Sequence, residues 1–410
     1  MNNWERVNLL FSAGSRPIKP ADELSLAELL LANRLPPSLF QAYVAPGNGS
    51  LRAIPITTPL NTVPDAHKVI LQCIRNTDVD SLRANDFETL QRDPLPIAAL
   101  FDFHYGKANA TNRVHLVDDD SLRNVVSSKI SSFLTENEIT LPLVAGISGG
   151  GDSNTLVQGI RRYLESASMP TTQVVCFTLV MDPLWPKSAA GRARELCAEA
   201  GFQHRVLGPV DTTALLGMQG SPTALWAEFA EQYGSDTSHF FGTFFVNLVG
   251  RRICEEVSGR HLLLGYNRED VLAELLFCLM NGRRPMPFPI RQMNTVKCVL
   301  PVWDVPKNLL DACYPHYSES NYTERVDVTT VARSSIYFIA HCLDALVPQL
   351  SISLMRGIHR LMTDLNGWQE LSPIHGTPLM HTGQGDELSE REVINMLRRF
   401  FPEWRPVSTQ

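Results

Sequence analysis

The chain has 410 residues, of which 44% are hydrophobic and 19% are charged, a composition typical of globular proteins and unlike that of disordered or fibrous chains. Its 36 lysines and arginines against 43 aspartates and glutamates give a formal net charge of −7, so there is no overall basic surplus of the kind that binds long nucleic acids. No apolar run reaches the roughly 20 residues of a membrane span, and the first residues lack the layout of a secretory signal, so we expect a cytoplasmic protein without a membrane partner.

The pattern of the first 80 residues predicts a small α/β accessory domain. Leu26, Leu29 and Leu30 recur at the spacing of one helix face, and short apolar runs on either side favour strands. The expected order is a strand pair, a helix and two later strands, at residues 6–11, 16–18, 24–31, 40–44 and 68–74. This succession resembles the β-grasp (ubiquitin-like) arrangement, although no terminal Gly-Gly is available to carry sulfur.

Residues 81–120 are expected to form a loop-rich linker, and an α/β domain is expected at 121–328. Within that domain short apolar strands alternate with helices, which predicts a parallel sheet covered by helices on both faces. The expected strands are 143–147, 174–179, 204–207 and 261–265, and the expected helices are 121–134, 154–164, 190–200 and 240–257. A helical C-terminal region is expected at 329–410, with a helical pair that breaks at Pro348.

A glycine-rich segment between the first strand and the next helix of this domain carries the clearest chemical signal. It runs Ser148-Gly149-Gly150-Gly151-Asp152-Ser153. Glycines allow a positive φ and a close approach of the backbone to an anion, and the amides at a helix N-terminus attract phosphate. The two serine hydroxyls can add donors. Asp152 can cap the helix or hold Mg²⁺ beside a pyrophosphate group.

The Ser-Gly-Gly-x-Asp-Ser pattern resembles the PP-loop of the ATP pyrophosphatases, whereas a Walker loop would need a lysine that is absent here. The resemblance covers about residues 140–350. It implies a parallel-sheet (HUP-like) domain that splits ATP between the α and β phosphates and leaves AMP on a substrate oxygen. ATP and Mg²⁺ are therefore the expected cofactors.

Downstream segments narrow the resemblance to enzymes that modify nucleobases. Residues 264–272 (Leu-Gly-Tyr-Asn-Arg-Glu-Asp-Val-Leu) resemble the Leu-Gly-His-His-Arg-Asp-Asp-Ile-Leu stretch of tRNA 2-thiocytidine synthetases. Residues 286–287 and 299–302 match later segments of that group, and 320–321 is similar to a Ser-Asn segment of lysidine synthetases. Within 264–272, an asparagine replaces a histidine and a glutamate replaces the first aspartate.

Cysteine placement separates this chain from the 2-thiocytidine enzymes. Those enzymes carry a Cys-x-x-Cys that holds an iron–sulfur cluster, whereas residues 238–244 here contain no cysteine and none of the eight cysteines forms such a pair. We therefore expect no iron–sulfur cluster, zinc knuckle or local redox pair. A transfer of sulfur would then need a lone cysteine, Cys313 or Cys278, although core packing is the favoured interpretation of both. His239 is expected to be a structural histidine.

The resemblance also implies roles for individual residues. Those expected to bind the nucleotide are Ser148, Gly149, Gly150, Gly151, Asp152, Ser153, Phe177, Thr178, Lys187, Gly265 and Arg283. Asp152 and Asp270 are expected to hold the metal and to act in catalysis, together with Cys313. Simpler alternatives exist: Glu269 and Asp270 can supply negative charge at a helix N-terminus, and Arg283 and Arg284 can be solvated surface residues.

The resulting hypothesis is an enzyme that adenylates a carbonyl oxygen and then replaces it with sulfur. The acidic composition favours a nucleobase-like small molecule as the acceptor over tRNA, with a sulfur or nitrogen donor protein as a further expected partner. Three alternatives stay open at this point. They are an amide- or amidine-forming ligase of the asparagine- or lysidine-synthetase type, a tRNA thiolation enzyme, and a nucleotide-binding module without turnover.

Overall fold

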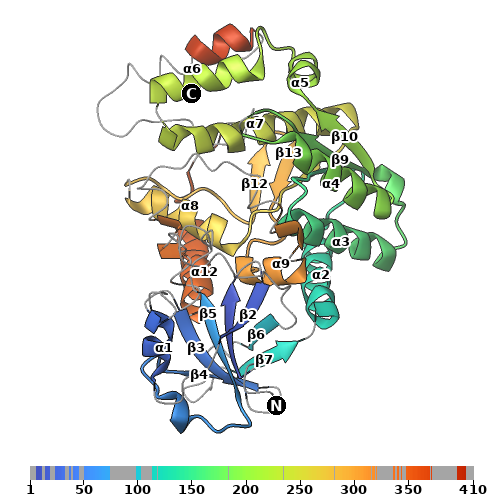
Figure 1. The fold of residues 1–410 in the computed structure, drawn as a ribbon. Coiled ribbons are helices and arrows are strands. Elements are labelled where there is room, and N and C mark those ends of the chain that lie inside the picture. Colours follow the sequence, from blue (N-terminus) through green and yellow to red (C-terminus); the bar gives the residue numbers. More distant parts are fainter. Residues whose placement is uncertain are drawn as a thin grey trace.

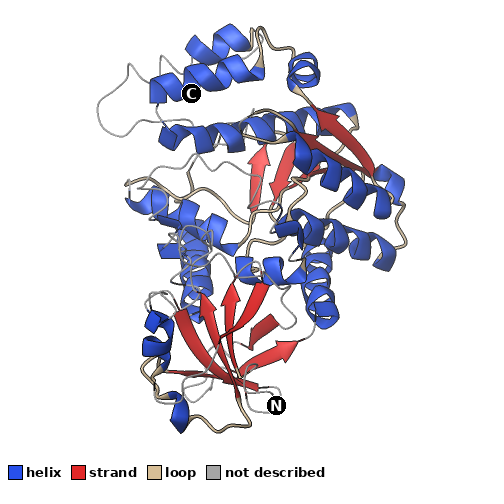
Figure 2. Ribbon diagram, in the orientation of Figure 1, coloured by secondary structure: helices blue, strands red, loops and turns tan. Residues whose placement is uncertain are grey.

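The computed structural model shows two β-sheets with helices around and between them (Figures 1 and 2). The structure describes residues 6–11, 14–18, 24–32, 37, 40–45, 50–73, 98–102, 113–117, 119–182, 184–233, 235–280, 282–314, 316–318, 320, 336–337, 339–340, 343, 348–369, 371 and 395–402.

The N-terminal sheet has seven strands in the order β2-β1-β5-β3-β4-β7-β6. Its elements are β1 (Val7–Phe11), β2 (Gly14–Ile18), α1 (Leu26–Ala32), β3 (Phe40–Ala45), β4 (Ser50–Ile54), β5 (Lys68–Cys73), β6 (Ala98–Asp102) and β7 (Arg113–Val117). β1 forms a hairpin with β2 and runs parallel to β5, and α1 packs on the sheet through buried leucines. This hairpin, helix and central parallel pair confirm the predicted β-grasp-like unit.

The sheet is larger than the sequence pattern indicates. β6 and β7 lie within residues 81–120, which are expected to be a linker, and they pair with each other and with β4. The N-terminal unit therefore extends to residue 117. β7 pairs with β4, which lies far from it in sequence, and local periodicity does not reveal such long-range pairing.

The second sheet has six strands in the order β10-β9-β8-β11-β13-β12. All neighbours are parallel except β12, which pairs antiparallel to β13 at one edge. The strands are β8 (Leu143–Gly146), β9 (Val174–Leu179), β10 (Gln203–Leu207), β11 (His261–Leu263), β12 (Ile290–Met293) and β13 (Val296–Val299). The predicted parallel α/β sheet is confirmed, with the glycine-rich segment directly after its central strand β8.

Helices cover both faces of this sheet because successive strand residues point to opposite sides. Val144, Leu262 and Leu264 pack into a core that contains α6 (Pro222–Tyr233), α7 (Ser235–Glu256) and α8 (Arg268–Met280). Leu143, Ala145 and Leu263 pack into the opposite core, with α2 (Asp119–Glu136), α3 (Gly151–Ser166), α4 (Lys187–Glu199) and α9 (Lys307–Cys313). The chain thus forms three layers around β8.

The remaining described helices lie at the periphery of this domain. α5 (Pro209–Leu216) follows β10, and the helical residues 395–400 lie beside α6 in Figure 1. α12 (Pro348–Asp364) begins at the proline where a helical break is expected, and it contacts α8. Most of the chain between 321 and 347 lies outside the described residues. Among the helices that the structure does describe, none has the combination of length and apolar character that crossing a bilayer demands.

The α2–α3 interface supplies a test of how tightly this domain is packed. A Cβ added at Gly159 in α3 would overlap the Ile130 side chain of α2. We expect Gly159→Ala to lower the free energy of unfolding by about 1–3 kcal/mol, because the extra methyl group forces the two helices apart.

The matched control is Gly191→Ala in α4, where a Cβ would meet no atom within 4 Å. That substitution should leave stability unchanged or raise it by about 0.5–1 kcal/mol, because alanine restricts the unfolded chain more than glycine does. Denaturant unfolding of both variants measures the difference. Equal effects would contradict the packing inferred here.

Candidate active site

The glycine-rich segment forms a tight connection from β8 to α3. Gly149 has a φ of 77°, and Gly150 precedes the first helical residue without any side-chain cap. The Ser148 backbone N–H donates to the Ser153 hydroxyl over 2.8 Å, and the two serine hydroxyls are also 2.8 Å apart. The serines therefore close the turn on one side.

Close packing explains why glycine occupies the loop. A Cβ at Gly149 would overlap the carbonyl oxygen of Ala189 in α4, and one at Gly151 would overlap the Ser318 hydroxyl. Arg192 of α4 also donates to the Gly149 carbonyl over 3.1 Å. The loop is thus held between α4 and the segment after α9, in a conformation that favours glycine.

Three segments that are distant in sequence meet at Asp152, the second residue of α3. The Asn267 amide donates to one carboxylate oxygen over 3.1 Å, and the Lys307 ammonium group lies 2.8 Å from the other. Lys307 also forms an ion pair with Asp311, one turn further along α9. Gly265 lies beside this cluster, since a Cβ there would be 3.9 Å from that of Asp152.

Asp270 and Asn267 form a reciprocal cap at the start of α8. The Asp270 N–H donates to the Asn267 side-chain oxygen over 2.9 Å, and the Asn267 N–H donates to the Asp270 carboxylate over 3.1 Å. Such a pair satisfies two backbone donors of the helix terminus. The expected position of Asp270 near Asp152 therefore comes about through Asn267, which contacts both.

Two buried carboxylates, Glu269 and Asp311, contact the first residue of α9, Lys307. Glu269 is 3% exposed and accepts a hydrogen bond from the Lys307 backbone N–H over 2.8 Å. Asp311 is fully buried, and burial raises its pKa to about 6, with the Asp152 charge adding to that rise and Lys307 opposing it. A buried carboxylate of this kind requires a cation beside it to remain ionised at neutral pH.

Phe177 and Thr178 of β9 support the loop from the neighbouring strand. The Thr178 hydroxyl donates to the Ile147 carbonyl over 2.5 Å, so it must accept from His204 Nε2, which lies 2.8 Å away. Burial, and then the Arg194 charge, lower the pKa of His204. The Phe177 carbonyl accepts the Ile147 N–H over 2.9 Å while its ring is buried in the core. Both residues thus fix the backbone just before Ser148.

Several residues expected at the site lie elsewhere. Lys187 is exposed in the first turn of α4, and Arg283 is half-buried after α8, where its backbone N–H donates to the Cys278 carbonyl over 2.8 Å. The structure does not connect either side chain to Asp152. The side chain of His239, and residue 321, lie outside the described residues.

The two candidate cysteines are core residues in this structure. Cys313 is fully buried among apolar residues of α2, α3 and α9. Cys278 is 3% exposed, and burial raises the pKa of its thiol to about 11. Because the thiolate is the reactive form, these surroundings do not favour Cys313 or Cys278 as a nucleophile, and the catalytic role of Cys313 stays a prediction.

Sequence reasoning missed Lys307 and Asp311, which the structure places at the centre of the cluster. A signal was available: Lys307 follows Pro306, which precedes the first turn of α9, and the Lys-x-x-x-Asp spacing places both side chains on one helix face. No group of three or more histidine, cysteine, aspartate or glutamate side chains in the described residues is arranged to hold a metal ion by itself.

No protein-family profile matches this chain, and no curated protein sequence does. Among solved structures, similar chains include the "U34-tRNA thiolase NcsA from Methanococcus maripaludis with its [4Fe-4S] cluster", with 16% identity and a TM-score of 0.45 over 61% of this chain and 82% of that one. NMN synthetase from Francisella tularensis shares 11% identity with a TM-score of 0.36, over 60% of this chain and 95% of that chain.

NAD+ synthetase from Burkholderia pseudomallei also shares 11% identity, with a TM-score of 0.33, over 68% of this chain and 87% of that chain. All three are PP-loop ATP pyrophosphatases. Identities and TM-scores this low describe a likeness in fold and nothing more. This chain's own strand order and the loop between β8 and α3 confirm the predicted parallel α/β domain with a glycine-rich strand-to-helix turn.

The loop conformation can be tested by adding one methyl group. We expect Gly149→Ala to lower the free energy of unfolding by more than about 1 kcal/mol, since it adds an overlap with Ala189 to the cost of a positive φ. Gly217→Ala is the matched control. Gly217 has a φ of 61°, and no atom lies within 4 Å of the added Cβ. The substitution there therefore costs only the free energy of placing alanine at a positive φ, without a steric overlap. Calorimetric unfolding of both variants should rank Gly149→Ala as the more damaging.

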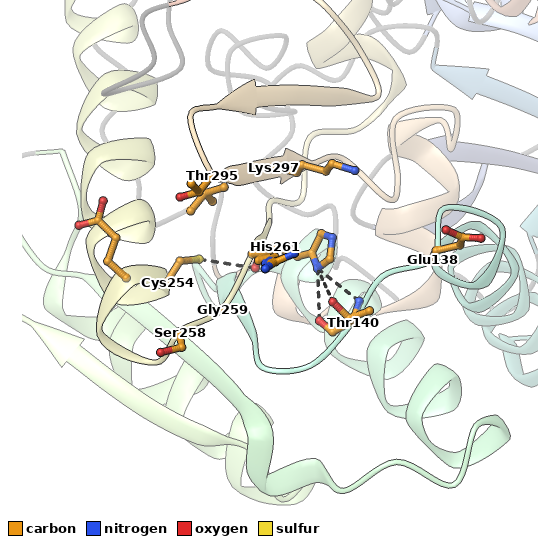
Figure 3. Close-up of a pocket in the computed structure, with 11 residues that line it drawn as sticks. Glu138, Thr140, Cys254, Ser258, Gly259, His261, Thr295 and Lys297 are labelled. Carbon is orange, nitrogen blue, oxygen red and sulfur yellow. Dashed lines mark hydrogen bonds between the residues drawn. The ribbon is translucent and has the colours of Figure 1, made fainter.

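A separate cavity of about 740 Å³ lies at the other end of the same sheet (Figure 3). His261 begins β11 and Lys297 is the second residue of β13. His261 pairs with the first residue of β8, whereas the loop follows the last. His261 Nδ1 lies 3.2 Å from the Thr140 carbonyl. Burial lowers the pKa of His261; the Thr140 carbonyl opposes this, while Lys297 and Arg260 add to it.

The lowered pKa of His261 predicts how stability depends on pH. Below its ordinary value of 6.5 the unfolded chain binds a proton that the folded chain resists, so the free energy of unfolding should fall as the pH drops below that value. We expect His261→Asn to remove part of this fall. Urea unfolding at a series of pH values measures it, and identical slopes in both proteins would contradict the prediction.

Proposed function

We propose that this protein is an ATP-dependent enzyme that transfers AMP to a carbonyl oxygen of its substrate and releases pyrophosphate. One observation carries the proposal: an uncapped N-terminus of a 16-residue helix follows a glycine loop at the end of the central parallel strand, with Asp152 directed at an amide and an ammonium group. The carboxyl ends of parallel strands are where open α/β sheets bind ligands.

The loop fits the β and γ phosphates of ATP. Backbone N–H groups at Gly150 and Gly151, together with the dipole of α3, favour negative charge there. Ser148 is exposed at the mouth of the turn, and its hydroxyl can donate to a phosphate oxygen. Adenine is expected beside the end of β9, where Phe177 and Thr178 fix the backbone.

The residues present also fit Mg²⁺. The Lys307 ammonium group, 2.8 Å from the Asp152 carboxylate, shows that this carboxylate accepts a cation in the present conformation. When bound, Mg²⁺ would be held by Asp152 together with phosphate oxygens and would neutralise phosphate charge, while Asp270 would act on that carboxylate only through Asn267. Asn267 would keep the Asp152 carboxylate oriented.

The reaction has two steps. A carbonyl oxygen of the acceptor attacks the α phosphorus, a new P–O bond forms, and the bond to the β phosphate breaks to release pyrophosphate. A sulfide equivalent then attacks the activated carbon, the C–O bond breaks, and AMP leaves with the oxygen. Positioning and charge neutralisation by the loop are the main contributions that the protein makes to the first step.

A nucleobase-like small molecule is the acceptor that we favour, with sulfur as the incoming atom. The net charge of −7 argues against an extended RNA contact. Because both candidate cysteines are buried, sulfur would come from a separate donor that delivers it at the oxidation level of sulfide. The same adenylated intermediate with an amine as the nucleophile would make the protein an amide- or amidine-forming ligase.

Pyrophosphate release tests the proposal directly. The protein is mixed with ATP and Mg²⁺ and with one acceptor class at a time: free nucleobases and nucleotides, carboxylates, or tRNA. We expect one class to stimulate release. Asp152→Ala should slow release by about 100-fold or more, because it removes the carboxylate that faces the phosphates.

The structure supplies a control and a reading for each outcome. Asp364→Asn changes an exposed carboxylate at the end of α12 and should behave as the unaltered protein does. Asp152→Ala leaves Lys307 paired with Asp311, so loss of activity would not reflect an unpaired charge in the core. ATP binding without release for any acceptor class would contradict the proposal and favour a binding module.

A further inference from the structure

The cluster at Asp152 holds one cation between two carboxylates. Lys307 contacts Asp152 and Asp311, and its side chain is 14% exposed, against 21% for Asp152 and none for Asp311. Two negative charges and one positive charge therefore lie at the entrance of a loop built to receive an anion. Phosphates arriving there would meet net repulsion unless a positive charge faces them.

The Lys307 side chain has more freedom to move than the buried Asp311 carboxylate. The Lys307 backbone is fixed by the hydrogen bond from its N–H to Glu269, and Asp311 lies fully buried one turn away. The ammonium group, in contrast, ends a flexible four-carbon stem and has three donors that rotate freely. It can leave Asp152 by rotation of its side-chain bonds alone, while Asp311 holds the stem at the site.

We propose that Lys307 is a phosphate-binding residue that exchanges one partner for another: it neutralises Asp152 in the absence of nucleotide and contacts the β and γ phosphates when ATP binds. This inference rests on the proposed function and deepens it. Asp311 is then a positioning residue, whose carboxylate keeps the ammonium group at the loop in both states. The exchange frees the Asp152 carboxylate at the moment when a phosphate group arrives.

A purely structural role for Lys307 makes a different set of predictions. Lys307 would then serve only to neutralise the buried Asp311, and removing both residues together would restore a stable protein with unchanged ligand affinity. A phosphate-binding role requires instead that affinity for phosphate-bearing ligands falls although the fold is intact. The two roles are separated by the double variant.

The experiment compares the double variant Lys307→Met/Asp311→Asn with Asp311→Asn and with the unaltered protein. Removing both charges leaves no unpaired ion in the core, which keeps the variant folded; thermal unfolding verifies this. Titration calorimetry then measures the affinity for ATP, inorganic pyrophosphate and adenosine, in buffer with EDTA and again with Mg²⁺. Reading affinity in EDTA separates the lysine's contribution from that of the metal.

We expect the double variant to bind ATP and pyrophosphate at least about tenfold more weakly than the unaltered protein, with adenosine affinity unchanged. Asp311→Asn keeps the ammonium group, so its affinity for ATP and pyrophosphate should lie between those of the double variant and the unaltered protein. Lys307→Arg, which keeps a positive charge, should lose less affinity than the double variant does. The matched control is Lys129→Met, which removes a different lysine–aspartate pair, to Asp304 at 2.8 Å, and should leave all three affinities unchanged.

The other outcomes distinguish failure of the proposed role of Lys307 from failure of the proposed function. If the folded double variant binds ATP and pyrophosphate as tightly as the unaltered protein does, the proposed function stays intact while the role of Lys307 is overturned. An equal loss of adenosine affinity shows that the variant distorts the whole site and also overturns it. If the unaltered protein binds neither ATP nor pyrophosphate, the proposed function fails and this inference fails with it.

Discussion

The contact between Asp152 and Lys307 is the interaction on which the arrangement of the site depends. The two residues are 155 positions apart in sequence, yet their side chains lie 2.8 Å apart. One belongs to the helix that follows the glycine loop and the other to α9, the helix that follows β13. Without Lys307, both Asp152 and the buried Asp311 would lose the cation that contacts them, and an unpaired buried charge costs several kcal/mol.

Other polar contacts of the site follow from that constraint. Asn267 can reach Asp152 because α8 begins directly beyond β11, next to β8 in the sheet. Glu269 on the first turn of α8 fixes the start of α9, which in turn aims Lys307. Polar groups from three crossovers of one parallel sheet are thus brought to its carboxyl end, which is the region where such sheets bind ligands.

The sequence permits prediction of those features that are encoded over short distances. Alternating strands and helices, the turn after β8 and the start of α12 at Pro348 each depend on neighbouring residues, so pattern and propensity were sufficient. Lys307 and Asp311 could not be placed because their partner is supplied by another part of the chain, and α9 has only seven residues.

The reciprocal cap between Asn267 and Asp270 is local, but sequence alone does not distinguish it from a carboxylate free to bind metal. Burial of Cys278 and Cys313 depends on how helices pack across the sheet.

The position of β8 has a consequence for how this chain folds as it is made. β8 lies between β9 and β11, and β11 is synthesised only after α3, β9, α4, β10, α5, α6 and α7. On the ribosome, one edge of β8 therefore has no strand to pair with while all of these elements emerge. An unpaired apolar edge strand attracts other chains, so this interval is the stage of biogenesis most exposed to aggregation. The glycine loop, which is already synthesised by then, acquires its charged partners last.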